Sequence, residues 1–163
     1  MGRQAVLVCN ESNILIDVSH LSERGFWDVV ELSKKPIIAS HSDAKGVYND
    51  RYHRNLSDKQ FRAIILSGGV CGINLYPDFL APHGARITDI IRHIEHFLSL
   101  GGQDHVGLGS DFDGIEKTPE GIKNVSDIAK LFNELSRLGY SDELLKKISY
   151  RNFMRVFGFI NHQ

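Results

Sequence analysis

Side chains that could bind metal or transfer protons each come soon after a short apolar run in this chain. They are Asp17, His20, His41, Asp111 and Asp113. Short, fully apolar runs are typical of buried parallel strands. In a parallel β/α barrel, the chemistry lies on the loops that leave the carboxyl ends of such strands. The positions of these side chains therefore predict an active site at one end of a parallel sheet.

Two histidines form the first candidate pair. His20 follows one predicted strand, and His41 follows the next. Because neighbouring strands lie about 4.8 Å apart, two neutral imidazoles at their ends can converge on one metal ion. Zinc is the natural candidate, although manganese and iron accept such sites too. The alternative is that each imidazole is a strand-end group that bonds to backbone.

The segment 107–114 places carboxylates at the same end of the sheet. Its small residues let the backbone approach a ligand closely. Asp111 could bind metal or accept a proton from an activated water. The alternative is a turn in which an aspartate caps the following segment. That alternative suits Asp113 better, because Asp111 lies nearer the end of the predicted strand.

Three residues on the intervening loops could line the same pocket. Arg54 lies on the long loop after His41, where its planar guanidinium could hold a substrate carboxylate. Asn74 and Tyr76 follow the third predicted strand. A loop arginine is more often a solvated charge, and Asn74 could equally satisfy backbone groups at the rim. All three are substrate-binding candidates on their position alone.

A second histidine pair, His93 and His96, is spaced i, i+3 on a predicted helix. Such a pair can bind metal, but helices form the outer ring of a barrel, remote from its active-site end. We therefore expect a solvated helix face here and no metal site.

Four apolar, β-rich runs predict the strands that carry the candidate residues. They span residues 14–18, 36–40, 70–75 and 106–109. Helix-length segments with start signals lie between and after them. The predicted helices span residues 23–34 after Ser22, a segment opened by the capping box 57–60, residues 89–100 after Thr88, 127–138 after Ser126, a short helix from Ser141 to Ile148, and 152–157, which closes the bottom of the core.

Residues 2–12 are ambiguous. Their β-branched content favours a strand, whereas their position before the run at 14–18 suits a helix in an alternating chain. Alternation favours the helix. The whole pattern predicts a single α/β domain over residues 1–163, with about four parallel βα units. Four units make half of a (β/α)8 TIM-type barrel.

Composition excludes several classes of function. The chain has 163 residues, a formal net charge of −1 and an isoelectric point near 6.7, so nucleic acid is not an expected partner. The apolar stretch near the N-terminus is too short for a membrane span. Cys9 and Cys71 show no metal or disulfide spacing, which suits a reducing compartment. We therefore expect a cytoplasmic protein without a membrane segment.

Several segments of the chain match a known family. They read LIDVSH at 15–20, PIIASHS at 36–42, RNL at 54–56, GGV at 68–70, DHVGLGSDFDG at 104–114 and NFMRV at 152–156. Through them the chain resembles the membrane (renal-type) dipeptidases, the M19 family of zinc dipeptidases among the amidohydrolase-like barrels. The resemblance runs in order from about residue 2 to 157 and covers only the C-terminal half of that family's barrel. It also implies that residues 2–12 form the helix before the fifth strand.

The resemblance implies roles for the candidate residues. His20 and His41, 21 residues apart, would bind the second of two zinc ions. Arg54 would hold the carboxylate of a dipeptide substrate. Asp111 would exchange a proton between the attacking water and the leaving amine. The implied reaction is hydrolysis of a dipeptide by metal-activated water.

The chain also differs from the family in the motifs that it lacks. Its N-terminal half carries a His-x-Asp motif on the first strand and a bridging glutamate on a middle strand, and no segment here corresponds to either. From this chain alone we therefore expect at most a partial zinc site and little or no dipeptidase activity.

Two hypotheses follow. In the first, the chain is one half of a metallodipeptidase, completed by a complementary N-terminal half. In the second, it is a non-catalytic half-barrel that pairs with itself or another chain, because an open parallel sheet leaves unpaired edges at 14–18 and 106–109. Both predict association, as a homo-oligomer or with the complementary half. They differ in how strongly metal is bound.

Overall fold

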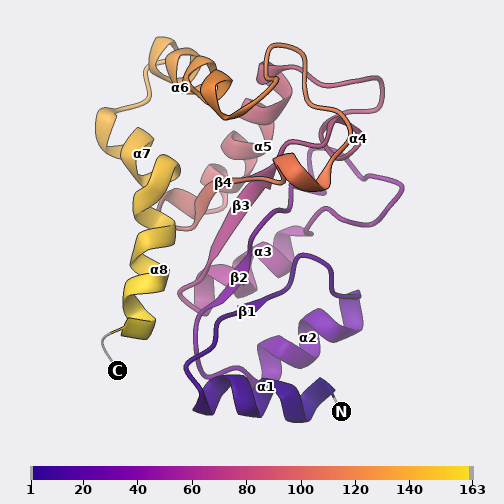
Figure 1. The fold of residues 1–163 in the computed structure, drawn as a ribbon, viewed down its shortest axis with the longest axis vertical. Coiled ribbons are helices and arrows are strands. Elements are labelled where there is room, and N and C mark those ends of the chain that lie inside the picture. The colour runs from indigo at the N-terminus through magenta and orange to yellow at the C-terminus, as the bar shows by residue number, and fades with distance from the viewer. Residues whose placement is uncertain (1, 162–163) are drawn as a thin grey trace.

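The computed structural model describes residues 2–161 and confirms an α/β fold (Figure 1). Its four parallel strands pair in chain order, β1-β2-β3-β4. They are β1 Ile16–Asp17, β2 Ile37–Ala39, β3 Val70–Asn74 and β4 Val106–Ser110. Because each connection returns to the same end of the sheet, all four carboxyl ends share one edge. This is the order of consecutive units in a (β/α)8 barrel.

Helices fill the connections between the strands and the segment after β4. The α-helices are α1 Gly2–Glu11, α2 Glu23–Leu32, α3 Asp58–Leu66, α4 Pro77–Leu80, α5 Ile87–Ser99, α6 Ile128–Arg137, α7 Asp142–Lys146 and α8 Asn152–Asn161. Short 3₁₀ turns span Gly102–Asp104, Phe112–Gly114 and Val125–Asp127, and a π-helical turn spans Lys147–Arg151. Within residues 2–161, every helix is too short or too polar to traverse a bilayer.

The predicted elements are present, with three corrections. Residues 2–12 form helix α1, as alternation predicted. Strand β1 is only two residues long, because the Ile14 N–H bonds to the Cys9 carbonyl of α1 at one end and the Asp17 carboxylate takes backbone N–H groups at the other. Helix α5 begins before Thr88, since Arg86 caps it through Asp89. Asn124, not Ser126, caps the turn that leads into α6.

The sheet curves strongly enough to bring alternate strands together at its carboxyl edge. A Cβ atom at Gly109 on β4 would lie 2.0 Å from the carbonyl oxygen of Ser40, which follows β2. A Cβ atom at Gly72 on β3 would lie 2.3 Å from the same oxygen. No side chain fits at these distances, so glycine is required at both positions. The small residues were expected to let the backbone approach a ligand. Here they let one strand approach another, as in a barrel that closes on itself.

Helix α8 closes the opposite end of the sheet, as predicted. Asn152 is buried and donates to the carbonyl of Val106 at 2.7 Å. The Arg155 guanidinium donates to three carbonyls that precede β3 and β4, those of Gly68, Gly69 and Asp104. Figure 1 shows α8 standing beside the sheet, with both ends of the described chain in the lower part of the view. The candidate site lies at the other end of the sheet, at its carboxyl edge.

His93 is buried inside the fold, so the prediction of a solvated helix face is wrong for it. Its Nδ1 accepts from the Ala44 N–H at 2.9 Å, and its Nε2 donates to the Leu80 carbonyl at 3.0 Å. Burial lowers the pKa of His93 to about 4. His96 donates to Asp58 at 2.8 Å instead. The two rings have different partners and do not form the joint metal site that their spacing permits.

We expect His93→Phe to remove one source of acid sensitivity. In the unfolded chain His93 takes up a proton below its ordinary pKa of 6.5, whereas in the folded chain it stays neutral down to about 4. The wild-type free energy of unfolding should therefore fall by about 3 kcal/mol more than that of the variant as the pH drops through this window. Urea denaturation across the window measures the difference.

The same variant should be less stable near neutral pH by about 1 to 3 kcal/mol, because Ala44 N–H and the Leu80 carbonyl lose their buried partner. Parallel pH profiles for the two proteins would show that His93 is not held neutral.

Candidate active site

The imidazoles of His20 and His41 meet at the carboxyl edge of the sheet. Their Nε2 atoms lie 2.8 Å apart, and their rings stand edge to face. Parallel pairing of β1 with β2 puts the two loops side by side. Burial lowers the pKa of His41, and the charge of Arg54 adds to this while that of Asp111 opposes it. The neutral ring is the form that binds metal.

A carboxylate and two hydroxyls hold His41 from behind. Asp17 Oδ1 accepts the N–H groups of Ser19 and Ser40 at 3.1 and 3.0 Å, and its Oδ2 accepts the Ser40 hydroxyl. Ser40 Oγ lies 2.6 Å from His41 Nδ1, and Ser19 Oγ accepts the His41 N–H at 3.0 Å. Burial raises the pKa of Asp17, but these hydrogen bonds outweigh it and leave the pKa below its usual value. Asp17 therefore faces Ser40 as a carboxylate.

Asp111 faces His41 from the end of β4. Its Oδ2 lies 3.8 Å from His41 Nε2. The pairing of β3 with β4 is irregular just before it, and Ser110 and Asp111 both adopt left-handed backbone, with φ of 49° and 69°. Bulges beside active sites often redirect a side chain. A Cβ atom at Gly114 would lie 2.3 Å from Asp111 Oδ1, so a side chain there would displace the Asp111 carboxylate from its observed position.

Asn74 satisfies backbone groups, which is one of the two roles considered for it, and it also contacts Asp111. It is fully buried, and its Nδ2 donates to Asp111 Oδ2 at 3.1 Å. Its Oδ1 accepts the Tyr76 N–H at 2.6 Å, and its own N–H donates to Asp43 Oδ1 at 3.2 Å. The amide thus satisfies backbone and orients the Asp111 carboxylate together. It lies behind Asp111 and not at the front of the pocket.

Asp43 is a buried carboxyl beneath the site. Burial raises its pKa well above the usual value, and the charge of Asp50 adds to this, while the Asn74 N–H and Arg54 oppose it. Within the described chain its Oδ2 has no hydrogen-bonding partner. Burial therefore disfavours the charged form of Asp43.

A buried aspartate positions the loop that carries Arg54. Asp50 accepts three backbone N–H groups, those of Tyr52, Arg54 and Asn55. Asn55 Nδ2 donates in turn to the Phe79 carbonyl at 2.7 Å. The Arg54 guanidinium lies over the Phe79 ring, and its Nη2 is 3.5 Å from His20 Nε2. Arg54 is thus held at the site and is not a freely solvated charge.

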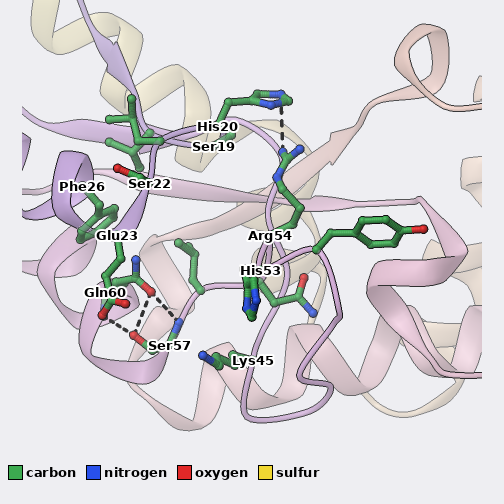
Figure 2. A pocket seen from close by; sticks show the side chains of 15 residues that line it. Ser19, His20, Ser22, Glu23, Phe26, Lys45, His53, Arg54, Ser57 and Gln60 are labelled. Atoms are coloured by element: carbon green, nitrogen blue, oxygen red, sulfur yellow. Dashed lines mark hydrogen bonds between the residues drawn. The ribbon is translucent and has the colours of Figure 1, made fainter. Parts of the chain in front are cut away.

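Two hollows meet at His20 and Arg54. The larger, about 640 Å³, lies between the loops that precede α2 and α3, and Figure 2 shows the Arg54 guanidinium reaching toward the His20 ring beside it. The smaller, about 470 Å³, has Asp111 on one wall and three aromatic rings on the others, those of Tyr52, Tyr76 and Phe79. Tyr76 is therefore placed on the wall of the hollow that contains the carboxylate.

These residues fit part of a metal site. Two nitrogens bound to one tetrahedral zinc lie about 3.3 Å apart. The observed 2.8 Å between His20 and His41 is short of that by about 0.5 Å, which small ring movements supply. Within the described residues, no group of three or more His, Cys, Asp or Glu side chains is arranged to hold a metal ion. The described residues thus bring two imidazoles together but not a full set of metal ligands.

The family model for membrane dipeptidase (peptidase family M19) matches residues 1–163. The chain belongs to this family. An uncharacterised protein from the pqqA 5′ region of Klebsiella pneumoniae is 41% identical over 160 residues, which are 95% of this chain and 58% of that protein.

Solved structures of M19 relatives have the same fold. One is described as dipeptidase AC, a metallopeptidase of family M19, and is 36% identical with a TM-score of 0.88 over 98% of this chain and 47% of its own. A metallopeptidase from Rhodobacter sphaeroides, bound to a phosphinate mimic of the dipeptide L-Ala-D-Ala, is 36% identical with a TM-score of 0.88 over 98% of this chain and 45% of its own. The chain thus spans about half the length of these relatives.

Several supporting residues could not be identified from the sequence, Ser19 among them. Ser40, Asp43 and Asp50 had no assigned role, yet each contacts a candidate residue or its loop. Adjacency was the available signal for Ser40, which directly precedes His41. For Asp43 and Asp50 no local pattern announces burial, because charged residues in loops are usually exposed.

Asn74→Ala tests how much the site depends on this buried amide. The variant leaves the Tyr76 N–H without its partner and frees the Asp111 carboxylate, so the free energy of unfolding should fall by about 2 kcal/mol. Urea denaturation measures it. Asn133→Ala, an exposed change on α6, is the matched control and should stay within about 0.5 kcal/mol of wild type. Equal stability of all three proteins would contradict the assigned contacts.

Proposed function

We propose that this chain supplies the His20–His41 half of a zinc-dependent dipeptidase active site, which hydrolyses the peptide bond of a dipeptide. The observation that carries the proposal is the meeting of four groups at one edge of the sheet. His20 and His41 Nε2 lie 2.8 Å apart, Arg54 Nη2 lies 3.5 Å from His20, and Asp111 Oδ2 lies 3.8 Å from His41. The family membership and the dipeptide mimic bound by the Rhodobacter sphaeroides relative support it.

Each side chain has a role that its surroundings suit. Zinc, when bound, would polarise the scissile carbonyl and make water nucleophilic near neutral pH. Asp111 would accept the proton of that water and pass it to the leaving amine, since it is oriented by Asn74 and borders the smaller hollow. Arg54 would hold the substrate carboxylate through its planar fork. Tyr76 would pack against the substrate from the aromatic wall.

The second half of the site would come from a complementary chain or segment. The chain covers 45 to 58% of the M19 relatives described above, and its sheet ends at β1 and β4 without a further strand among the described residues. We place residues 1–163 as one half-barrel domain that associates through these edges, with a complementary N-terminal half or with a second copy.

The alternative function is a non-catalytic half-barrel. It is favoured by one observation, that no group of three or more metal-binding side chains occurs within residues 2–161. In that case the His20–His41 pair would bind zinc weakly or not at all, and association through the sheet edges would be the chain's whole role.

Zinc binding separates the two functions. We expect the purified chain to bind no more than one zinc ion, and His20→Ala to abolish that binding because it removes one of only two imidazole ligands. Titration calorimetry with zinc alone measures both. His83→Ala is the matched control, since His83 is an exposed histidine remote from the pair, and it should bind as wild type does. Unchanged zinc binding by His20→Ala would remove His20 from the site.

The enzyme activity and molecular mass of the chain test whether it is an incomplete half of a dipeptidase. The isolated chain should turn over simple dipeptides little or not at all, and activity should appear when the separately expressed N-terminal half of an M19 relative is added. Light scattering should show a mass above 18.4 kDa for the associated form. Two zinc ions per monomer with full turnover by the chain alone would contradict the proposal.

Arg54→Lys tests recognition of the substrate carboxylate. Lysine keeps the charge but loses the planar fork, so in the active assembly KM for a dipeptide should rise by at least about tenfold with a smaller change in kcat. Arg51→Lys is the control, because the Arg51 side chain lies on the same loop but is 74% exposed and pairs with Asp78. A selective fall in kcat for Arg54→Lys would assign Arg54 to the chemical step instead.

A further inference from the structure

We propose that Asp17, acting through Ser40, fixes the tautomer of His41 so that its Nε2 bears a lone pair directed at the site before any metal arrives. Asp17 is thus a positioning residue and not a ligand. The inference deepens the proposed function and rests on it for its purpose, although the hydrogen-bond argument stands on the metal-free chain.

The Asp17 carboxylate fixes the position of the Ser40 hydroxyl proton. Its two oxygens accept two backbone N–H groups and the Ser40 hydroxyl, and a carboxylate has no proton to give back. The single hydroxyl proton of Ser40 must therefore lie on the bond to Asp17. If that proton pointed to His41, the Asp17 and Ser40 oxygens would face each other in hydrogen-bonding contact with no proton between them.

The Ser40 oxygen can then only accept from His41. Ser40 Oγ lies 2.6 Å from His41 Nδ1, so Nδ1 carries the ring proton and donates it. In a neutral imidazole the other nitrogen is then unprotonated, which leaves Nε2 with its lone pair. Metal-binding histidines are commonly held in this way by a group behind the ring. The backbone on each side is fixed as well, since Ser19 Oγ accepts the His41 N–H at 3.0 Å.

The tautomer of His20 follows from that of His41. Two imidazole nitrogens 2.8 Å apart need one proton between them when no cation is present. Because His41 Nε2 has none, His20 Nε2 supplies it, and the Arg54 Nη2 group 3.5 Å away then has no acceptor on the His20 ring. The proton that metal binding displaces is therefore that of His20, while His41 is already in its ligand form. The hydrogen bonds from His20 through His41 and Ser40 to Asp17 form one row. In this row every donor points toward the Asp17 carboxylate.

Nitrogen-15 NMR of the metal-free chain tests this directly. Long-range ¹H–¹⁵N spectra at a pH where both rings are neutral should show His41 protonated at Nδ1 and His20 at Nε2. Addition of zinc should move the His20 proton to Nδ1 and leave the His41 proton in place. A wild-type His41 protonated at Nε2 would overturn the inference.

Asp17→Asn changes the direction of the row while keeping its shape. The amide would donate to Ser40 Oγ, the Ser40 hydroxyl would turn to His41 Nδ1, and the ring proton would move to Nε2. Zinc affinity should fall by about tenfold to a hundredfold. Asp142→Asn, an exposed aspartate in the first turn of α7, removes the same charge without touching the row and should match wild type. A wild-type tautomer and affinity in Asp17→Asn would overturn the inference.

Ser40→Ala provides a second route if Asp17→Asn does not fold. Loss of the hydroxyl should leave His41 as a mixture of tautomers, and an unchanged pure Nδ1–H form would overturn the inference. The NMR result also separates this inference from the proposed function. The predicted tautomers in a wild-type chain that binds no zinc would support the row and contradict the metal site.

Discussion

The parallel pairing of β1 with β2 is the constraint on which the candidate site depends. It sets Asp17 opposite Ile38, two residues before Ser40, so that one carboxylate reaches both the backbone and the hydroxyl of Ser40. A shift of one residue would turn every side chain of β1 to the other face of the sheet. The same carboxylate ends β1, since Asp17 replaces the backbone ladder at the carboxyl end of the strand. The two imidazoles converge because this register holds.

The loop after β2 contains buried polar atoms that have no hydrogen-bonding partner among the described residues. Ser42 Oγ, Asp43 Oδ2, Arg54 Nε and Asn55 Oδ1 are the buried polar side-chain atoms without a partner in the described chain, and all four belong to residues 42–55. Unsatisfied groups of this kind are costly and concentrate where function requires them. The loop is nevertheless held in place, by Asp50 from within and by His93 from helix α5. Holding Arg54 at the site thus costs free energy of folding, and the rest of the fold offsets that cost.

Much of this arrangement could be predicted from the sequence. Apolar runs predicted the four parallel strands, because strand burial leaves a strong pattern, and alternation favoured a helix at the ambiguous residues 2–12. The strand ends predicted which side chains would meet, and the family resemblance is confirmed by the family model. The burial of His93, the bulge that turns Asp111 and the row behind His41 could not be predicted, since each depends on contacts between residues 23 to 49 positions apart. The roles of the site residues stay predictions.

The central claim is that His20 and His41 direct their Nε2 atoms at one shared cation. Anomalous diffraction at the zinc edge, from crystals of the chain grown with zinc, tests it most directly. The expected result is a single strong peak about 2.0 to 2.1 Å from both Nε2 atoms. A peak beside other histidines, such as His96, with none between His20 and His41, would contradict it.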